Sequence, residues 1–242
     1  MPGRSFFFLR HAERCDFTVE ASHVFVEKAF DTNGNYTRFD LNLPESLPKR
    51  SDGHEAYQRD TPLTVMGYLQ ATLIGKEYRR NGVKIDQVYS SPALRSIETA
   101  QAFLEGYGYK VDPNYSPCTE TSDLTIQEPL ENYYTRSSNL VRTISEQSSG
   151  NILFVGHSGT LEACTRTLCG KEARSEEDYY NLLGHCTYLA SLEMRQTESG
   201  TFHLAGCPVM PLTVSRVQPF DADMLTVSAE DLAAAKRKTK HF

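Results

Sequence analysis

Two histidines in this chain lie in short runs whose residue types could take part in chemistry. His11 comes after Arg10 and opens the run HAER, and His157 lies in the run GHSG. A single histidine in such a place is more often a structural hydrogen-bonding group, so neither position alone assigns a function. An imidazole held neutral can nevertheless form a covalent intermediate when one of its nitrogens is aimed at an electrophile.

Three arginines accompany these histidines in the sequence. Arg10 and Arg14 flank the first histidine, and Arg95 follows the run SSPAL, in the first turn of an expected helix. A cation there opposes the helix dipole unless an anion neutralises it. A cluster of guanidiniums and imidazoles repels itself unless it holds an anion, and guanidinium forks match phosphate oxygens in pairs. The residue types therefore predict a phosphate site.

The overall charge excludes other sources of attraction for an anion. The chain has 25 Lys and Arg against 31 Asp and Glu, a net charge of −6 over 242 residues. A negative protein has no general field that gathers nucleic acid or an anionic membrane. We therefore expect no nucleic-acid partner, and binding of a phosphorylated substrate must depend on the local cations.

The expected chemistry is phosphoryl transfer. Arg10, Arg95 and His157 would stabilise the charge on the equatorial oxygens during transfer. A carboxylic acid must then protonate the leaving oxygen and later take a proton from the attacking water.

Short apolar runs predict the strands that position these groups. Phe6–Leu9, Ile85–Tyr89 and Ile152–Val155 are typical of buried parallel strands. The histidines and the SSPALR segment follow them, and open α/β sheets bind ligands at the carboxyl ends of their strands. The three groups are therefore expected to meet.

Helices are expected between these strands. One begins near Thr61, with apolar residues at helical spacing as far as Ile74, and another begins at Ser91-Pro92. Further helices are expected around 139–146 and 160–168. Strands alternating with helices predict an α/β fold, a three-layer sandwich whose mainly parallel central sheet is flanked by helices.

The whole chain, 1–242, is expected to be one domain. Residues from about 15 to 60 are polar and irregular, which predicts a smaller insertion lobe, and the loop 111–130 is irregular as well. Long insertions beside a site tend to be functional, so both are predicted to form a cap over it. The six cysteines show no CxxC pair or zinc spacing, and no apolar stretch is long enough to span a membrane. A reduced cytoplasmic protein without a bound metal or a membrane contact is expected.

Three motifs together resemble the histidine phosphatase (phosphoglycerate mutase-like) superfamily. They are RHAER, SSPALRSIETAQ and VGHSGTLEACTR, in that order. HAERCD, YTRFDLNLPESLPKRS, SPALR, TLEACT and CPVMPLT are more narrowly similar to the phosphatase domain of the Sts (suppressor of T-cell receptor signalling) proteins and to the ecdysteroid-phosphate phosphatases. This similarity extends over nearly the whole chain.

The resemblance implies a two-lobed α/β fold and hydrolysis of phosphomonoesters without a metal or other cofactor. Carried over by position, His11 is the nucleophile, Arg10, Arg95 and His157 bind the phosphoryl group, and Arg14 is an additional substrate-binding arginine. The implied partner is a phosphorylated small molecule, such as a steroid or aryl phosphate, or a phosphotyrosine protein. A homodimer is also carried over from related domains.

Two positions depart from the family pattern. Ala12 replaces the glycine that usually follows the nucleophile, a small change that we expect to be tolerated. The proton donor of the Sts type lies in a segment like VEPGLFEW, whereas this chain continues VDPNYSPCTETSD. Glu120 is the first candidate, if a short insertion is assumed, and Asp123, Glu128 and Glu131 are the alternatives.

Two other functions are compatible with the same residues. A phosphoglycerate mutase needs a very basic, closed site, and the sequence shows no additional cluster of Lys and Arg. A catalytically weak phosphate- or phosphopeptide-binding module is the other alternative, because the proton donor is not assigned.

Overall fold

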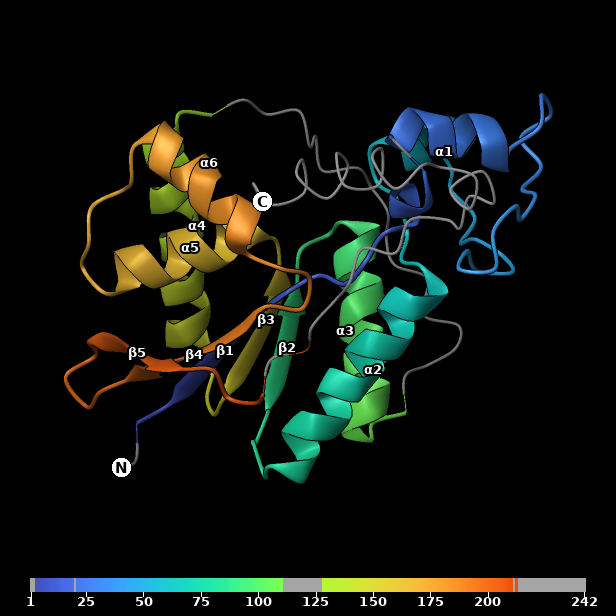
Figure 1. Ribbon diagram of the computed structural model, residues 1–242. Helices are drawn as coiled ribbons and strands as arrows, with labels where there is room; N and C mark the ends of the chain where they lie inside the picture. The colour runs from blue at the N-terminus through green and yellow to red at the C-terminus, as the bar shows by residue number, and fades with distance from the viewer. Residues whose placement is uncertain (1–2, 20, 111–127, 211, 213–242) are drawn as a thin grey trace, which may run out of the picture.

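A five-stranded sheet forms the centre of the protein (Figure 1). The structure, a computed structural model, describes residues 3–19, 21–110, 128–210 and 212. The strand order is β2-β3-β1-β4-β5, in which β2, β3 and β1 are parallel and β4 and β5 run antiparallel to their neighbours. The strands are β1 Ser5–Arg10, β2 Gln87–Ser90, β3 Ile152–Gly156, β4 Ser191–Gln196 and β5 Phe202–Gly206.

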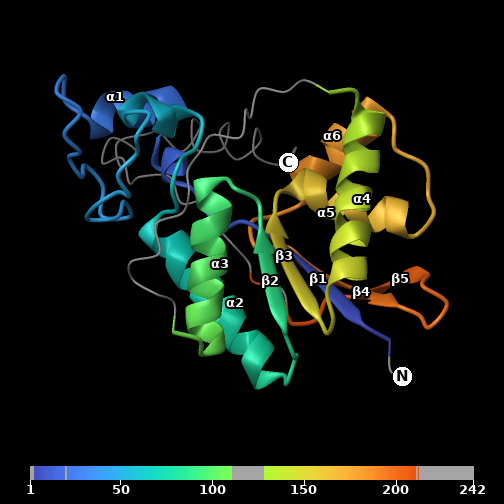
Figure 2. The same cartoon turned by 180° about the vertical axis from the view of Figure 1, so that it is seen from behind.

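Helices cover both faces of the sheet (Figures 1 and 2). One face carries α2 and α3, and the other carries α4, α5 and α6. The helices are α1 Ser22–Ala29, α2 Val65–Arg80, α3 Leu94–Tyr107, α4 Leu130–Gln147, α5 Ser158–Leu168 and α6 Glu176–His185, with short 3₁₀ turns at Cys15–Thr18 and His54–Gln58. The predicted three-layer α/β architecture is confirmed.

The alternation of β1 explains why both faces must be covered. Phe6 and Phe8 point into the core shared with α4 and α5, whereas Phe7 and Leu9 point into the core shared with α2 and α3. All four side chains are buried. Successive residues of a strand face opposite sides, so an unbroken apolar run indicates a strand between two helical layers.

Glycines allow α2 and α3 to pack closely. A Cβ atom on Gly75 would collide with the carbonyl oxygen of Phe103, and one on Gly106 would collide with that of Thr72. The buried face of α2 therefore consists of small residues with Ile74 and Tyr78. The apolar residues whose spacing predicts this helix lie largely outside that face: Met66, Leu69 and Leu73 are about half exposed. The helix is confirmed, but it begins at Val65 rather than Thr61, because the Thr64 side chain caps it by accepting from the Gly67 N–H.

The insertion has a small core of its own. Phe25, Val26, Ala29 and Leu43 pack with Tyr57 and against Leu94 at the start of α3. This core fixes the insertion to the helix that carries Arg95. The proposed cap over the site also included 111–130, of which 111–127 lie outside the described residues, so that cap stays a prediction.

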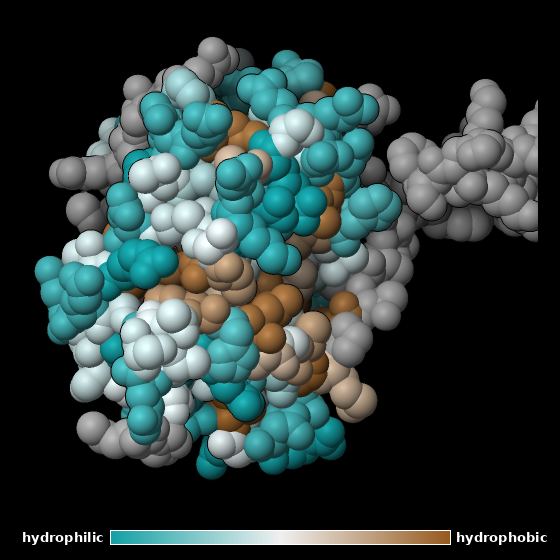
Figure 3. All heavy atoms as spheres, turned by 90° about the vertical axis from the view of Figure 1, so that its left-hand side faces the viewer, coloured by the Kyte–Doolittle hydropathy of each residue, from teal (hydrophilic) through white to brown (hydrophobic). Residues whose placement is uncertain are grey.

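The sheet ends at the edge strand β5 (Figure 1). Seen from that side, apolar colour gathers across the middle of the surface between hydrophilic margins (Figure 3). Leu204 of β5 and Leu140 of α4 are both more than half exposed. No helix in the described part of the chain is both long and apolar enough to cross a membrane.

Candidate active site

The sheet register brings the two histidines together. Arg10, the last residue of β1, pairs with Gly156, the last residue of β3, so that His11 and His157 leave neighbouring strands at the same level. The His11 N–H donates to the Gly156 carbonyl oxygen at 2.8 Å. The two imidazole ring centres are 5.3 Å apart, with the ring planes at 68°. The expected meeting of the strand ends is confirmed.

A hydrogen bond sets the tautomer of His11. Its Nδ1 lies 2.9 Å from the Ala12 carbonyl oxygen, which can only accept, so Nδ1 carries the proton and the Nε2 lone pair is free. Burial, and next the neighbouring His157, hold the pKa of His11 well below its usual value. The imidazole is therefore neutral at physiological pH, as a nucleophile must be.

Ala12 fits the place of the expected glycine. Its methyl group is fully buried in the core on the α2 and α3 side. Its N–H donates to the Thr99 hydroxyl at 2.9 Å, and that hydroxyl donates to the Arg95 carbonyl oxygen at 2.6 Å. Thr99 thus joins the segment of His11 to the helix of Arg95.

The second histidine is also neutral. Burial, followed by the charges of Arg95, Arg10 and Arg14, lowers the pKa of His157 to about 3. Its Nε2 lies 3.0 Å from the Ser91 hydroxyl, which follows the end of β2. A bound dianion would reverse the electrostatic contribution and favour the protonated, donating imidazole.

The three predicted arginines surround these histidines. Arg95 lies in the first turn of α3 and is buried, and Arg10 is partly buried; burial lowers the pKa of both guanidiniums. The charge of Arg14 lowers both pKa values further, which places the three cations within range of one another. The electrostatic repulsion among them is what a bound anion would relieve.

Each arginine also keeps an unused donor. The Nε atoms of Arg10, Arg14 and Arg95 are buried and have no hydrogen-bond partner among the described residues. Buried polar groups in native proteins are nearly always hydrogen-bonded, so three unpartnered donors in one cluster indicate a ligand with several acceptor oxygens. Carboxylates neutralise only two of the three arginines. Arg14 Nη2 lies 2.7 Å from Asp16 Oδ2, and Arg95 Nη1 lies 3.4 Å from Asp60 Oδ1.

Asp60 is a site residue that the sequence reasoning missed. Its Oδ1 accepts from the Leu94 N–H at 2.8 Å, and its Oδ2 accepts from Arg50 Nη1 at 2.9 Å. Arg50 also binds Asp52 through Nε at 2.9 Å and Nη2 at 3.0 Å. Asp60 therefore fixes the start of α3 and the Arg95 side chain to the insertion. The signal available in the sequence was an acid at the start of the run DTPLT, whose last residue, Thr64, caps α2.

The proton donor remains a prediction. Glu120 and Asp123 lie outside the described residues. Glu128 pairs with Arg136, and that contact lowers the pKa of Glu128, which is opposite to the requirement for a proton donor at neutral pH. Glu131 is exposed in the first turn of α4.

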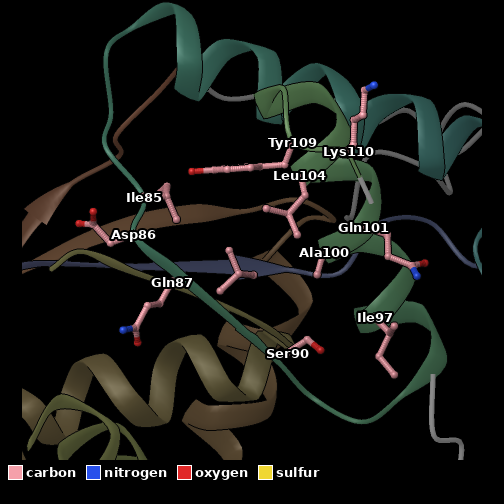
Figure 4. A pocket seen from close by; sticks show the side chains of 11 residues that line it. Ile85, Asp86, Gln87, Ser90, Ile97, Ala100, Gln101, Leu104, Tyr109 and Lys110 are labelled. Atoms are coloured by element: carbon pink, nitrogen blue, oxygen red, sulfur yellow. The ribbon is translucent and has the colours of Figure 1, made fainter. Parts of the chain in front are cut away.

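A separate hollow of about 520 Å³ lies between the edge strand β2 and α3 (Figure 4). Ile85, Val88, Ile97, Ala100 and Leu104 give it an apolar lining, and Tyr109 and Lys110 close one side. Ser90 lines it next to Ser91, so one end of the hollow approaches the strand ends. No group of three or more His, Cys, Asp or Glu suited to a metal occurs within the described ranges.

Comparisons with known proteins agree with this geometry. The model of the Histidine phosphatase superfamily (branch 1) matches residues 50–116. The chain is 31% identical to ecdysteroid-phosphate phosphatase of Drosophila melanogaster over 93% of this chain and 35% of that protein. It is also 31% identical to human ubiquitin-associated and SH3 domain-containing protein B, over 87% of this chain and 38% of that protein. The chain thus spans little more than a third of the length of these relatives.

A solved structure is similar over nearly the whole domain. This is the crystal structure of the ecdysone phosphate phosphatase of Bombyx mori in complex with tungstate. The superposed region includes 92% of this chain and 99% of the Bombyx mori chain. The TM-score is 0.68 and the sequence identity is 29%.

Proposed function

The chain belongs to the histidine phosphatase superfamily, and we propose that it hydrolyses phosphomonoesters through a phosphohistidine on His11. The observation that carries this proposal is the convergence of two neutral imidazoles with three guanidiniums whose buried Nε donors are unpartnered. A tetrahedral phosphoryl group supplies the oxygens that these donors lack. The Bombyx mori relative was solved in complex with tungstate, a tetrahedral oxyanion of similar shape, which supports binding of a phosphoryl group here.

In the first step, the Nε2 lone pair of His11 forms a bond to phosphorus while the ester oxygen leaves. Arg10, Arg95 and His157 stabilise the equatorial oxygens as charge is redistributed. Arg14 is an additional substrate-binding arginine. The leaving oxygen takes a proton from a carboxylic acid, and Glu120 is our proposed donor.

In the second step, a water oxygen attacks phosphorus and the N–P bond breaks. The carboxylate takes a proton from this water, so the acid and the neutral imidazole are restored and inorganic phosphate is released. No metal or other cofactor takes part in either step as proposed.

For the substrate, we propose a phosphomonoester of an aromatic or steroid alcohol, with phosphotyrosine in a protein as the second member of that class. The support comes from relatives named as ecdysteroid-phosphate phosphatases. A homodimer is proposed on the resemblance alone, and a cytoplasmic location on the spacing of the cysteines.

The test is hydrolysis of p-nitrophenyl phosphate between pH 4 and 8. Wild type is compared with His11→Ala and with the control variant His203→Ala, because His203 is exposed on β5. We expect turnover in wild type and His203→Ala and its loss in His11→Ala. Turnover that survives in His11→Ala would contradict the proposal. Vanadate binding without turnover in wild type would instead favour a phosphate-binding module.

A further inference from the structure

One loop makes three contacts with Arg10. The loop 186–190 joins α6 to β4, and its Cys186 carbonyl oxygen accepts from Arg10 Nη1. The Ala190 carbonyl oxygen accepts from the Arg10 backbone N–H at 2.9 Å. Between these two contacts the Tyr188 ring lies against the guanidinium, with the ring centre 4.4 Å from Cζ. The predicted phosphate-binding arginine thus depends on this loop for its placement.

Tyr188 connects Arg10 with the rest of the site. Its ring centre is 5.5 Å from that of His11 and 5.0 Å from that of Phe17. Phe17 in turn lies against the Arg14 guanidinium, with the ring centre 5.9 Å from Cζ. Tyr188 is 8% exposed, so it lies beneath the reacting groups and does not line an open binding surface.

The backbone holds this ring in place. Leu189 has φ +57°, and it is the one non-glycine residue in the described ranges with a positive φ. This left-handed conformation persists in a bulky residue when the surrounding structure enforces it. Here the Leu189 side chain is buried in the core on the α2 and α3 side, whereas Tyr188 faces the site. The core thereby fixes the tyrosine.

An aromatic ring suits this place better than a carboxylate. The face of the ring is electronegative and attracts a guanidinium without carrying a full charge. Burial raises the pKa of Tyr188 to about 12, so the phenol stays neutral. A carboxylate bound to Arg10 would compete with the incoming phosphate for the same donors. The ring restrains the guanidinium and leaves its unpartnered Nε available.

We propose that Tyr188 is a positioning residue that holds Arg10 in the arrangement that binds the phosphoryl group. This inference rests on the proposed function, because it assigns a role toward the phosphate that Arg10 binds. The observations that carry it are the ring contacts with Arg10 and His11 and the loop that fixes them.

The test is a double-mutant cycle measured as orthovanadate affinity of the full chain. Tyr188→Leu is made alone and together with Arg10→Gln, and Tyr188→Phe keeps the ring but removes the hydroxyl. Cation–π contacts predict a loss of about 3- to 30-fold in Tyr188→Leu and about threefold or less in Tyr188→Phe. If Tyr188 acts through Arg10, Tyr188→Leu changes affinity less than about twofold when Arg10 is already Gln.

Phe202→Leu is the control for a general loss of stability. Phe202 of β5 is buried in the core on the α4 and α5 side, where its ring packs against Phe6. We expect this variant to lower the melting temperature and leave vanadate affinity unchanged. Where Tyr188→Leu does not fold, Tyr188→Met, which has a similar length but no ring, is measured against the same criteria.

Three results would overturn the proposal: an unchanged affinity in Tyr188→Leu, an equal loss in both Arg10 backgrounds, or an equal loss in Phe202→Leu. Failure of the proposed function has a different signature, because wild type would then neither bind vanadate nor hydrolyse an aryl phosphate.

Discussion

Replacing Asp60 with Asn should weaken both the fold and the phosphate site. The Asp60 side chain is 6% exposed and links Arg50 of the insertion to the start of α3. An asparagine keeps an acceptor for the Leu94 N–H, but it loses the negative charge and presents donors to Arg50. The substitution therefore removes one partner of a buried ion pair while changing the volume very little.

The contacts set the size of the effect. Removing one partner of a buried pair costs about 3–5 kcal/mol. Arg50 keeps two hydrogen bonds to Asp52, so we expect the lower end, about 3 kcal/mol. At about 2–4 °C per kcal/mol for a chain of 150–250 residues, the melting temperature should fall by about 6–12 °C. Arg95 loses a charged but long contact of 3.4 Å, and a loss of about tenfold in vanadate affinity is expected.

Asp52→Asn is the matched control. It removes a carboxylate from the same arginine, but this carboxylate is 32% exposed and has no contact with Arg95. Exposed ion pairs contribute about 0–1 kcal/mol, so stability and vanadate affinity should both stay close to wild type. Thermal unfolding and vanadate titration of the two variants give the comparison. Equal effects of the two substitutions, or an Asp60→Asn protein indistinguishable from wild type, would refute the reasoning.

Two further predictions concern protons. Because the pKa of His157 is about 3, binding of sulfate, a tetrahedral dianion that brings no proton at pH 6, should be accompanied by proton uptake at that pH. Calorimetry in buffers of different ionisation enthalpy measures the uptake, and sulfate binding without it would contradict the neutral His157. Burial raises the pKa of Glu98 to about 8, so this group stabilises the fold below about pH 4.5 and that contribution is lost as the pH rises toward 8. Glu98→Gln, which retains an acceptor for the Leu63 N–H, should flatten the fall in unfolding free energy between pH 5 and 8, and an unchanged slope in denaturant titrations would refute the assignment.

The site could be predicted from the sequence where the residues are local to strand ends. His11 and His157 each follow an apolar run, and parallel strands must bring their carboxyl ends to one edge. The same rule places Arg95, because SSPALR follows β2 directly. The order of the strands was not needed for this inference.

Long-range contacts could not be predicted in the same way. Nothing in the spacing shows that Asp60 reaches Arg95 or that Tyr188 lies beneath Arg10, because each pair is joined only by the folded chain. The buried face of α2 was also missed, since close packing selects Gly67, Ala71 and Gly75 over the larger apolar residues. Apolar periodicity identifies a helix but does not show where another backbone approaches it.

The most direct test of the mechanism is detection of the phosphoryl group on His11. Wild type is mixed with an aryl phosphate that is labelled in its phosphoryl group, and the reaction is quenched in alkali within the first turnover. The protein is then digested for mass spectrometry. The account predicts an acid-labile phosphoryl group on the peptide that contains His11, absent from His11→Ala. Turnover with no labelled peptide, or with the label on His157, would contradict it.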